Sequence, residues 1–256
     1  MKMKLFLLSA IALGTAALSA AEVTVEPPLV SMKKEWNDGS MTGKNTHAMY
    51  VAGKKYPDCW SYWYADSGIT PETAILKPLN AIDPDFVAGT FWAKYTPILT
   101  AGFNAKRKGF IFWPAMIRNN LVVRYSNKTF GAAYGFRNPF AKDTICYIEG
   151  RLRHPQEARA YVYVKSADGK LKMLADSSKP GALFVMNTKH RNGNVERRQY
   201  LKLQIEVKLA PGDMVMFAGF RPDYAGKAST GRDVHFMSVD DFWGKAYQPK
   251  ISFEQE

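Results

Sequence analysis

Residues 199–209 read Gln-Tyr-Leu-Lys-Leu-Gln-Ile-Glu-Val-Lys-Leu, and this stretch decides the fold of the chain. Apolar and polar residues alternate along it, with Leu201, Leu203, Ile205, Val207 and Leu209 separated by Lys202, Gln204, Glu206 and Lys208. Successive side chains of a strand point to opposite faces, so the pattern predicts a strand with one buried and one solvated face. The next four residues, Ala-Pro-Gly-Asp, supply a turn, and a second apolar run then begins at Met214, as in a β-hairpin. We therefore expect a half-exposed antiparallel sheet.

Similar strand patterns recur along the chain between Gly and Pro residues. The predicted strands cover residues 50–52, 58–64, 89–92, 110–113, 121–125, 132–136, 144–152, 158–165 and 171–174, with a last one around Val234 and Phe236. Asp168-Gly169 is a predicted hairpin turn. Short strands at roughly 8–12-residue spacing, with almost no helical periodicity, predict an all-β antiparallel sandwich that is jelly-roll-like and has long N-terminal loops. We expect a single domain over residues 58–256, preceded by an N-terminal extension over residues 22–57.

The first 21 residues are typical of an export signal. Lys2 and Lys4 give a positive start, residues 5–18 are apolar, and residues 19–21 are small, as cleavage requires. The apolar run is short for a membrane span, and a retained amphipathic anchor is the alternative to cleavage. We expect a mature chain that begins at Glu22, has no transmembrane segment and is secreted, to the periplasm or outside the cell.

The chain is basic, with 35 Lys and Arg against 23 Asp and Glu and a formal net charge of +12. Removing the two lysines of the signal leaves +10 (12 − 2). An exported protein rarely meets nucleic acid, so the charge indicates a glycan or another anionic envelope polymer as partner, with solubility alone as the alternative. Residues 189–198 are the densest basic segment and contain Arg191, Arg197 and Arg198. This segment could bind anionic groups through arginine, or be a solvated hairpin tip.

Several segments follow one another in a recognisable order from Asp58 to Trp243. They are Trp60-Ser61-Tyr62, Phe91-Trp92, Tyr95-Thr96-Pro97-Ile98, Phe112-Trp113-Pro114-Ala115, residues 144–152, Tyr161-Val162-Tyr163-Val164, residues 207–213 and a terminal strand around residues 233–239. In layout the chain resembles exported bacterial β-sandwich modules of the galactose-binding or jelly-roll type. The resemblance implies an extracellular, non-catalytic module, often associated with glycans. Such modules commonly carry a His-Pro-Gly turn before the long strand pair, where this chain has Trp113-Pro114-Ala115.

Aromatic residues are the first candidates for ligand contact, because 6 Trp and 13 Tyr exceed the needs of a plain sandwich core. An aromatic ring can stack on the C–H face of a sugar. Tyr161 and Tyr163 alternate with valines on a predicted strand, between Arg159 and Lys165. If the valines face the core, the tyrosines form an exposed platform for a glycan; if both faces of the sheet are covered, they belong to a second core layer. Trp63 is the more exposed candidate of the two tryptophans on its strand.

Two further groups of residues are candidates for structural or metal-binding roles. Cys59 and Cys146 permit one disulfide in an oxidising compartment, and a buried free thiol is the alternative. Asp233, His235 and Asp240 lie close together near the end of the chain, where carboxylates could hold Ca²⁺ or simply be solvated surface charges. Because a metal site needs converging ligands, we expect no cofactor.

Familiar catalytic patterns are missing from the sequence, which has no Gly-x-Ser-x-Gly elbow, His-Glu-x-x-His, phosphate loop or Cys-x-x-Cys. The favoured hypothesis is an exported, non-catalytic module that binds carbohydrate or another cell-envelope polymer through surface aromatics and Arg or Lys. Two alternatives stay open. One is a polysaccharide lyase or hydrolase with an unfamiliar site, and the other is a structural or assembly protein of the envelope.

Overall fold

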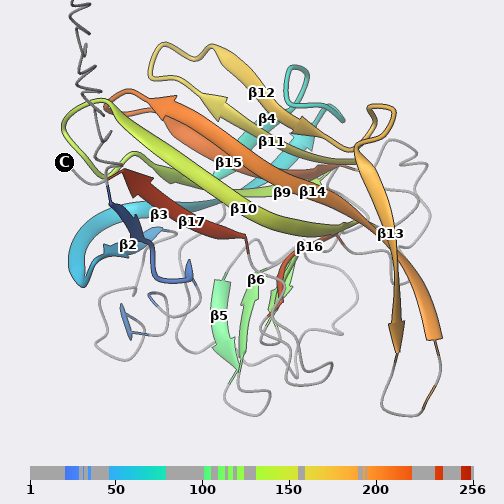
Figure 1. Cartoon of the computed structure of the whole chain (residues 1–256). Coiled ribbons are helices and arrows are strands. Elements are labelled where there is room, and N and C mark those ends of the chain that lie inside the picture. The colour runs from blue at the N-terminus through green and yellow to red at the C-terminus, as the bar shows by residue number, and fades with distance from the viewer. Residues whose placement is uncertain are drawn as a thin grey trace, which may run out of the picture.

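The computed structural model describes residues 21–28, 31, 34–35, 46–78, 101–104, 109–112, 115–117, 120–123, 131–154, 159–189, 193, 195–220, 234–238 and 249–254 (Figure 1). These residues are organised almost entirely as strands. The strands are β1 (Glu22–Thr24), β2 (Thr46–Val51), β3 (Lys54–Ser67), β4 (Ile75–Pro78), β5 (Ala101–Asn104), β6 (Gly109–Phe112), β7 (Ala115–Ile117), β8 (Asn120–Val123), β9 (Gly131–Arg137), β10 (Thr144–His154), β11 (Arg159–Lys165), β12 (Leu171–Asp176), β13 (Leu183–Lys189), β14 (Val195–Leu209), β15 (Met214–Phe220), β16 (Val234–Ser238) and β17 (Lys250–Glu254).

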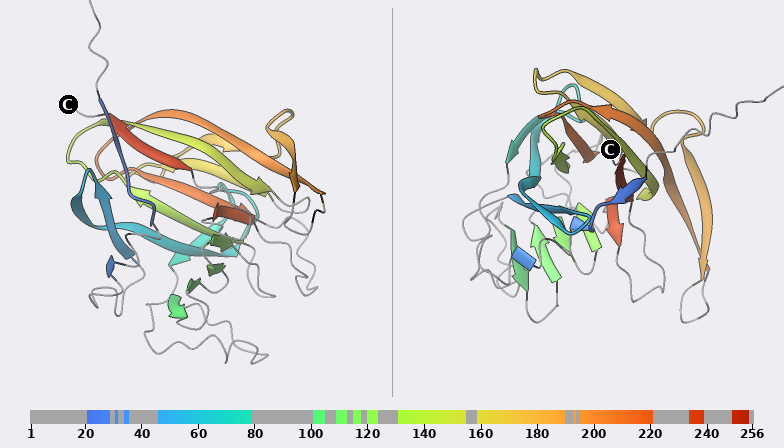
Figure 2. Two further views of the ribbon diagram at one scale, coloured as in Figure 1. Left: turned by 60° about the horizontal axis from the view of Figure 1, so that its bottom comes forward. Right: turned by 60° about the vertical axis from the view of Figure 1, so that its left-hand side comes forward.

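The strands form two antiparallel sheets. Sheet A has the order β1-β17-β10-β16-β8-β7-β6-β5, with β14 paired to the other edge of β10 and β13 paired to β14. Sheet B has the order β12-β11-β15-β9-β3-β2, with β4 paired to β3. Figures 1 and 2 show β10 and β14 of sheet A packed over β9 and β15 of sheet B. The prediction of an all-β antiparallel sandwich is confirmed.

The core between the sheets is built from the alternation seen in the sequence. On β14, Leu201, Leu203, Val207 and Leu209 are at most 3% exposed, whereas the polar residues between them are exposed. Sheet B contributes a layer of aromatic and aliphatic side chains, which includes Trp60, Tyr62, Tyr134, Phe136, Val162, Val164, Val215 and Phe217. Complete burial of each large apolar side chain contributes about 1.5–3 kcal/mol, so this interior is the main source of stability.

The turn over residues 210–213 forms as predicted, but it does not close a hairpin. The amide nitrogen of Asp213 donates to the carbonyl oxygen of Ala210 at 3.1 Å, and Gly212 has a φ of +85°, which glycine adopts without strain. However, β14 pairs with β10 and β13, whereas β15 pairs with β9 and β11. The expected hairpin between these strands is wrong, because turn residues specify a reversal but not the partner of the next strand. The chain crosses here from sheet A to sheet B.

The predicted turn at Asp168-Gly169 does join a hairpin. The amide nitrogen of Gly169 donates to the carbonyl oxygen of Ser166 at 2.9 Å, and β11 and β12 on either side pair within sheet B. This hairpin and the crossing at residues 210–213 end on the same side of sheet B, since Lys165 lies opposite Met214. Together they border one end of the outer face of sheet B.

The N-terminal part contributes more structure than the predicted extension of loops. β1, β2 and the beginning of β3 fall within residues 22–57; β1 pairs with β17 in sheet A and β2 pairs with β3 in sheet B. Strands β13 and β17 were not predicted either, and β13 with the start of β14 forms a hairpin that projects from the body (Figure 1). Residues 1–20 and the predicted strand at 89–92 lie outside the described residues. Within the described part, no helix has the length and apolar character that a membrane crossing requires.

Both cysteines are buried and free in the structure. Cys146 on β10 and Cys59 on β3 belong to the core between the sheets, which corresponds to the alternative of buried thiols rather than to a disulfide. Burial raises the pKa of the Cys59 thiol to about 11, with the charge of Asp58 adding to the shift and that of Arg137 opposing it. A thiol in this state is a poor nucleophile.

Candidate functional site

Tyr161 and Tyr163 lie on the outer face of sheet B but are not exposed. They are 3% and 1% exposed, and they pack with Phe220 and other residues into a second apolar cluster outside the main core. Leu76 of β4 and Ile69 of the segment before it cover this cluster. The predicted exposed tyrosine platform is therefore wrong, and the alternative of a second core layer holds. Burial raises the pKa of both hydroxyls.

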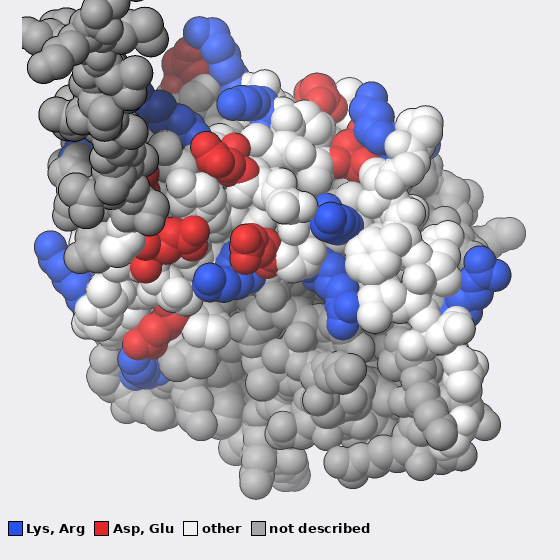
Figure 3. Space-filling view, viewed as in Figure 1, with Lys and Arg blue, Asp and Glu red and all other residues white. Residues whose placement is uncertain are grey.

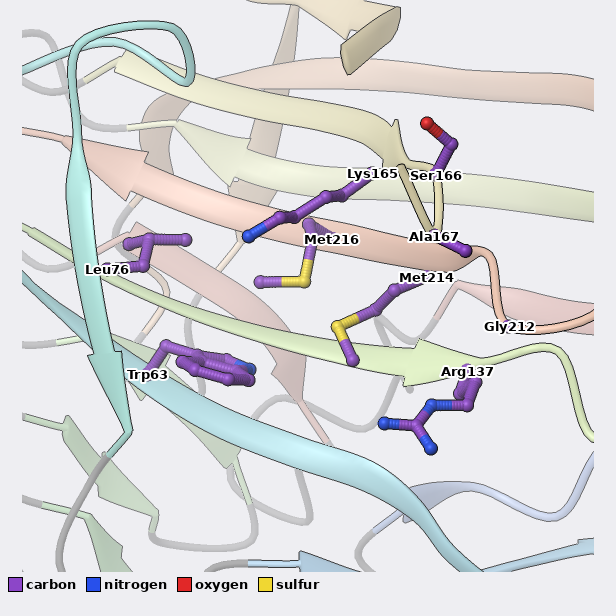
Figure 4. Close-up of a pocket in the computed structure, with 9 residues that line it drawn as sticks. All are labelled: Trp63, Leu76, Arg137, Lys165, Ser166, Ala167, Gly212, Met214 and Met216. Atoms are coloured by element: carbon purple, nitrogen blue, oxygen red, sulfur yellow. The ribbon is translucent and has the colours of Figure 1, made fainter. Parts of the chain in front are cut away.

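Beyond this covered part, the same face opens into a pocket of about 390 Å³ (Figure 4). Its size is within the range of small-molecule sites. The lining residues come from five strands and two turns, and they are Trp63 (β3), Leu76 (β4), Arg137 (β9), Lys165 (β11), Met214 and Met216 (β15), Ser166 and Ala167, and Gly212. We call this set the outer pocket.

Small residues on β9 give the outer pocket its depth. Gly135 and Ala133 face outward between the larger side chains of β3 and β15, with Gly135 in register with Met216. A Cβ atom on Gly135 would lie 2.4 Å from the Met216 sulfur and 2.6 Å from the carbonyl oxygen of Val215. Because the second of these atoms is backbone, a side chain at this position would force the strands apart. The two methionines can therefore lie flat over β9 and form an apolar floor.

Trp63 forms one wall of the outer pocket, and its ring is fixed by a neighbour on the same strand. Its indole nitrogen donates to the hydroxyl oxygen of Ser61 at 2.9 Å. Trp63 is partly exposed, whereas Trp60 is fully buried on the other face of β3. The expectation that Trp63 is the more exposed tryptophan is confirmed. A fixed indole with an open face presents a rigid apolar surface to a ligand.

Two cations flank the floor in one row across three strands. Met214 of β15 lies in register with Arg137 of β9 on one side and with Lys165 of β11 on the other. With about 4.8 Å between neighbouring strands, the two backbones are about 10 Å apart. Both cationic side chains are exposed, and Figure 4 shows them extending over the floor from its two sides.

None of the nine lining residues is acidic, and the carboxylates of Asp168 and Asp213, in the two bordering turns, have partners within those turns. The Asp168 carboxylate pairs with Lys170 at 2.6 Å and accepts a hydrogen bond from the Ser166 hydroxyl, and these partners hold its pKa well below the usual range. Asp213 accepts a hydrogen bond from the amide nitrogen of Ala210 at 2.9 Å. The outer pocket is therefore positively charged over an apolar floor, which suits a ligand that carries both a flat apolar face and an anionic group.

The structure brings two of the predicted ligand-binding residues, Trp63 and Lys165, into one site. Arg159 is the first residue of the strand that ends at Lys165, and its side chain is hydrogen-bonded to Tyr161. It does not line the outer pocket. Arg197 is exposed on the hairpin of β13 and β14, 12 residues before the end of β14, which is about 40 Å along an extended strand. Arg191 and the side chain of Arg198 lie outside the described residues.

The side chains predicted as metal ligands also lie outside the described residues. Asp233, Asp240 and the side chain of His235 are not among the described residues, although the backbone of His235 belongs to β16. Where the structure is described, no group of three or more His, Cys, Asp and Glu side chains could hold a metal ion.

A buried polar cluster lies on the core side of sheet B. His47 is fully buried, its Nε2 lies 2.7 Å from the Tyr62 hydroxyl, and its Nδ1 lies 3.0 Å from the carbonyl oxygen of Ala48. Its ring stacks on Trp60 at 6.1 Å and on Tyr62 at 5.6 Å between centroids. None of these residues lines the outer pocket. Their enclosure indicates a structural role.

Sequence reasoning missed Arg137, Met214, Met216 and Leu76. One local signal could have found part of the site: Ala133 and Gly135 share one face of the predicted strand 132–136, and Arg137 directly after it continues their spacing, so that two small residues lead to a cation. The other members depend on which strands lie side by side.

Comparisons with known proteins identify no ligand for the outer pocket. No family model and no curated protein matches the chain. Among solved structures, it is similar to the CBM3a-L domain with flanking linkers from scaffoldin cipA of the cellulosome of Clostridium thermocellum. The identity is 12% and the TM-score 0.17, over 41% of this chain and 70% of that chain. A likeness at this level carries no argument about the ligand.

We expect Gly135→Ala to lower the free energy of unfolding by about 1–3 kcal/mol, because the added methyl group overpacks the floor of the outer pocket. Chemical denaturation measures the change. In a double-mutant cycle, Met216→Ala should reduce the cost of Gly135→Ala, since it removes the sulfur atom that the methyl group meets. Equal stability of Gly135→Ala and the wild type would contradict the close packing described here.

Proposed function

We propose that the protein is an exported, non-catalytic module that binds acidic carbohydrate in the outer pocket. The observation that carries the proposal is the row of Arg137, Met214 and Lys165 across sheet B beside the fixed indole of Trp63. A sugar ring packs its C–H face against the indole and the methionine floor. Its carboxylate or sulfate group pairs with the guanidinium and ammonium groups.

Each part of the pocket has a distinct role in this proposal. The aromatic wall supplies apolar contact area at a low cost in conformational entropy, because Trp63 is already held by Ser61. Arg137 can bind a carboxylate or sulfate in bidentate fashion, and Lys165 adds a second charge from the opposite side of the floor. The formal charge of +10 that remains after signal removal favours the approach of polyanions.

The charge of the outer pocket contrasts with the outer face of sheet A. Figure 3 shows acidic and basic side chains interspersed over that face. There Lys202 and Lys208 on β14 are exposed alongside Glu206, and Lys208 pairs with Asp143 at 2.8 Å. A mixed face of this kind has no strong preference for anions. The positive charge of the outer pocket is therefore the more specific feature, and it favours a discrete ligand over general adhesion.

A glycan array probed at low and moderate salt tests the proposal directly. We expect retention of uronate-containing or sulfated glycans and little retention of neutral ones, with binding that weakens as salt rises. Calorimetry on a retained glycan should show that Trp63→Ala and Lys165→Ala each weaken binding by about 10–100-fold, since each removes a principal contact. Arg197→Ala is the matched control, because it removes an exposed cation far from the site.

Two results would overturn the proposal. Equal retention of neutral and acidic glycans that does not change with salt would remove the role of the cations. A loss from Arg197→Ala as large as that from Lys165→Ala would move binding to the β13–β14 hairpin.

A further inference from the structure

A second pocket, of about 270 Å³, lies where the β2–β3 hairpin approaches the paired strands β1 and β17. Its lining residues include Lys54, Tyr56, Phe140, Lys142, Thr144 and Glu254. We call it the end pocket. Like the outer pocket, it combines aromatic surface with cationic side chains.

The aromatic part of the end pocket is held rigidly. Phe140 meets the Tyr56 ring edge-on, with 5.5 Å between centroids, and meets the buried ring of Phe253 edge-on at 5.2 Å. The ammonium group of Lys54 lies 5.1 Å from the centre of the Tyr56 ring. These contacts place a cation beside an aromatic surface before any ligand arrives, which lowers the ordering cost of binding.

One turn connects the two pockets. Arg137 lines the outer pocket at the end of β9, and Phe140 and Lys142 line the end pocket only three and five residues later. The side-chain amide of Asn138 donates to the carbonyl oxygen of Lys142 at 3.1 Å, and its amide oxygen accepts from the Phe140 nitrogen at 3.0 Å. These bonds close the turn that follows Arg137 and contains Lys142.

The same side chain ties this turn to the neighbouring crossing between the sheets. The side-chain nitrogen of Asn138, Nδ2, also lies 3.2 Å from the carbonyl oxygen of Leu209 and 3.1 Å from that of Ala210. Asn138 is only 5% exposed. The Asn138 backbone nitrogen donates to the carbonyl oxygen of Asp213 at 2.8 Å. Since Gly212 in that crossing lines the outer pocket, one buried asparagine fixes the borders of both pockets relative to each other.

We propose that the end pocket is a second subsite for the same ligand, so that the protein binds a chain of acidic sugars across the turn at residues 138–143. This inference rests on the proposed function. The chain would meet Lys165 and Arg137 in the outer pocket, and Lys142 and Lys54 in the end pocket. Each pocket combines aromatic surface with two of these cations, which suits a chain of acidic sugar units.

The carboxylates around the end pocket are compatible with this ligand. Asp143 pairs with Lys208, and Asp58 accepts a hydrogen bond from the Thr46 hydroxyl at 2.7 Å. Glu254 lines the end pocket itself, where it and the Thr144 hydroxyl can accept hydrogen bonds from sugar hydroxyl groups. A ligand with hydroxyl groups as well as anionic groups satisfies this set better than a purely anionic one.

Two linked subsites predict that affinity depends on chain length. A short ligand occupies the outer pocket alone, whereas a longer one also reaches the end pocket at a high effective concentration and gains affinity without any new kind of contact. We expect an increase of about 10–100-fold between a ligand that reaches one pocket and one that spans both.

Oligogalacturonates of defined length, titrated by calorimetry, test this expectation. The wild type should bind the hexamer about 10–100-fold more tightly than the dimer. The double variant Lys54→Ala/Lys142→Ala should bind the hexamer almost as weakly as the dimer and leave dimer binding unchanged. Trp63→Ala should weaken both. Chemical denaturation of each variant verifies that the fold is intact, and poly-glutamate of similar charge is the control for unspecific attraction.

The outcomes separate this inference from the proposed function. If length has no effect while Trp63→Ala still weakens binding, the end-pocket subsite is wrong and the outer pocket stands. If the protein binds no acidic glycan of any length, the proposed function fails, and the subsite with it. If poly-glutamate binds as tightly as the hexamer, the pockets recognise charge rather than sugar, and the inference is overturned.

Discussion

The free energy of unfolding should fall by up to about 5 kcal/mol between pH 6.5 and pH 3, because the buried His47 resists protonation. Burial lowers the pKa of His47 from its ordinary 6.5 to about 3, and the bond to Ala48 offsets only part of this. The carbonyl oxygen of Ala48 can only accept a hydrogen bond, so Nδ1 carries the hydrogen and donates to it. The other ring nitrogen, Nε2, therefore accepts from the Tyr62 hydroxyl. A second proton would sit on Nε2, which could then no longer accept from the Tyr62 hydroxyl.

The sign of the effect follows from proton uptake. Below pH 6.5 the unfolded chain protonates His47 but the folded protein does not until about pH 3, so acid favours unfolding across this window. Chemical denaturation between pH 7 and pH 3.5 measures the stability. His47→Gln is the control, because glutamine keeps a donor and an acceptor but does not titrate. The difference in stability between wild type and variant should change by about 1.4 kcal/mol per pH unit, and parallel curves would refute the assignment.

The alternation in residues 199–209 identified both the fold class and the inner face of β14, because period-2 burial is a local property of the sequence. The same reasoning put Val162 and Val164 on one face of β11 and the two tyrosines on the other, and both valines are buried. It could not tell that the outward Tyr161 and Tyr163 are covered. Their cover comes from β4 and the residues before it, almost ninety positions earlier in the chain, and no local pattern links the two segments.

The residues of the candidate site also differ in whether local sequence could predict them. Trp63 and Lys165 could be found from the sequence, because an aromatic or cationic residue on the outward face of a strand is visible locally. Arg137 and Met214 could not, because they join the site only through the register of β9, β15 and β11. The misassigned hairpin at residues 210–213 had the same origin, since strand pairing is set by long-range packing rather than by the turn.

Phe217→Ala should lower the free energy of unfolding by about 3–5 kcal/mol, a large part of the 5–15 kcal/mol typical of a folded domain. Phe217 is fully buried at the centre of the aromatic layer of sheet B. Its ring stacks on Tyr134 with 4.9 Å between centroids and an angle of 10°, and it packs against Phe136 at 6.4 Å. Removing the ring leaves a cavity between the two sheets that rigid neighbours cannot fill.

Chemical denaturation of two further variants shows whether this cost comes from the ring and its position. Phe217→Leu retains most of the apolar volume and should cost well under half as much as Phe217→Ala, because it leaves a smaller cavity. Val195→Ala is the surface control: Val195 is 63% exposed on the β13–β14 hairpin, so its truncation should change stability by less than about 0.5 kcal/mol. If Phe217→Ala cost no more than Val195→Ala, the two sheets would not share the interior that orients the outer face of sheet B and its pocket.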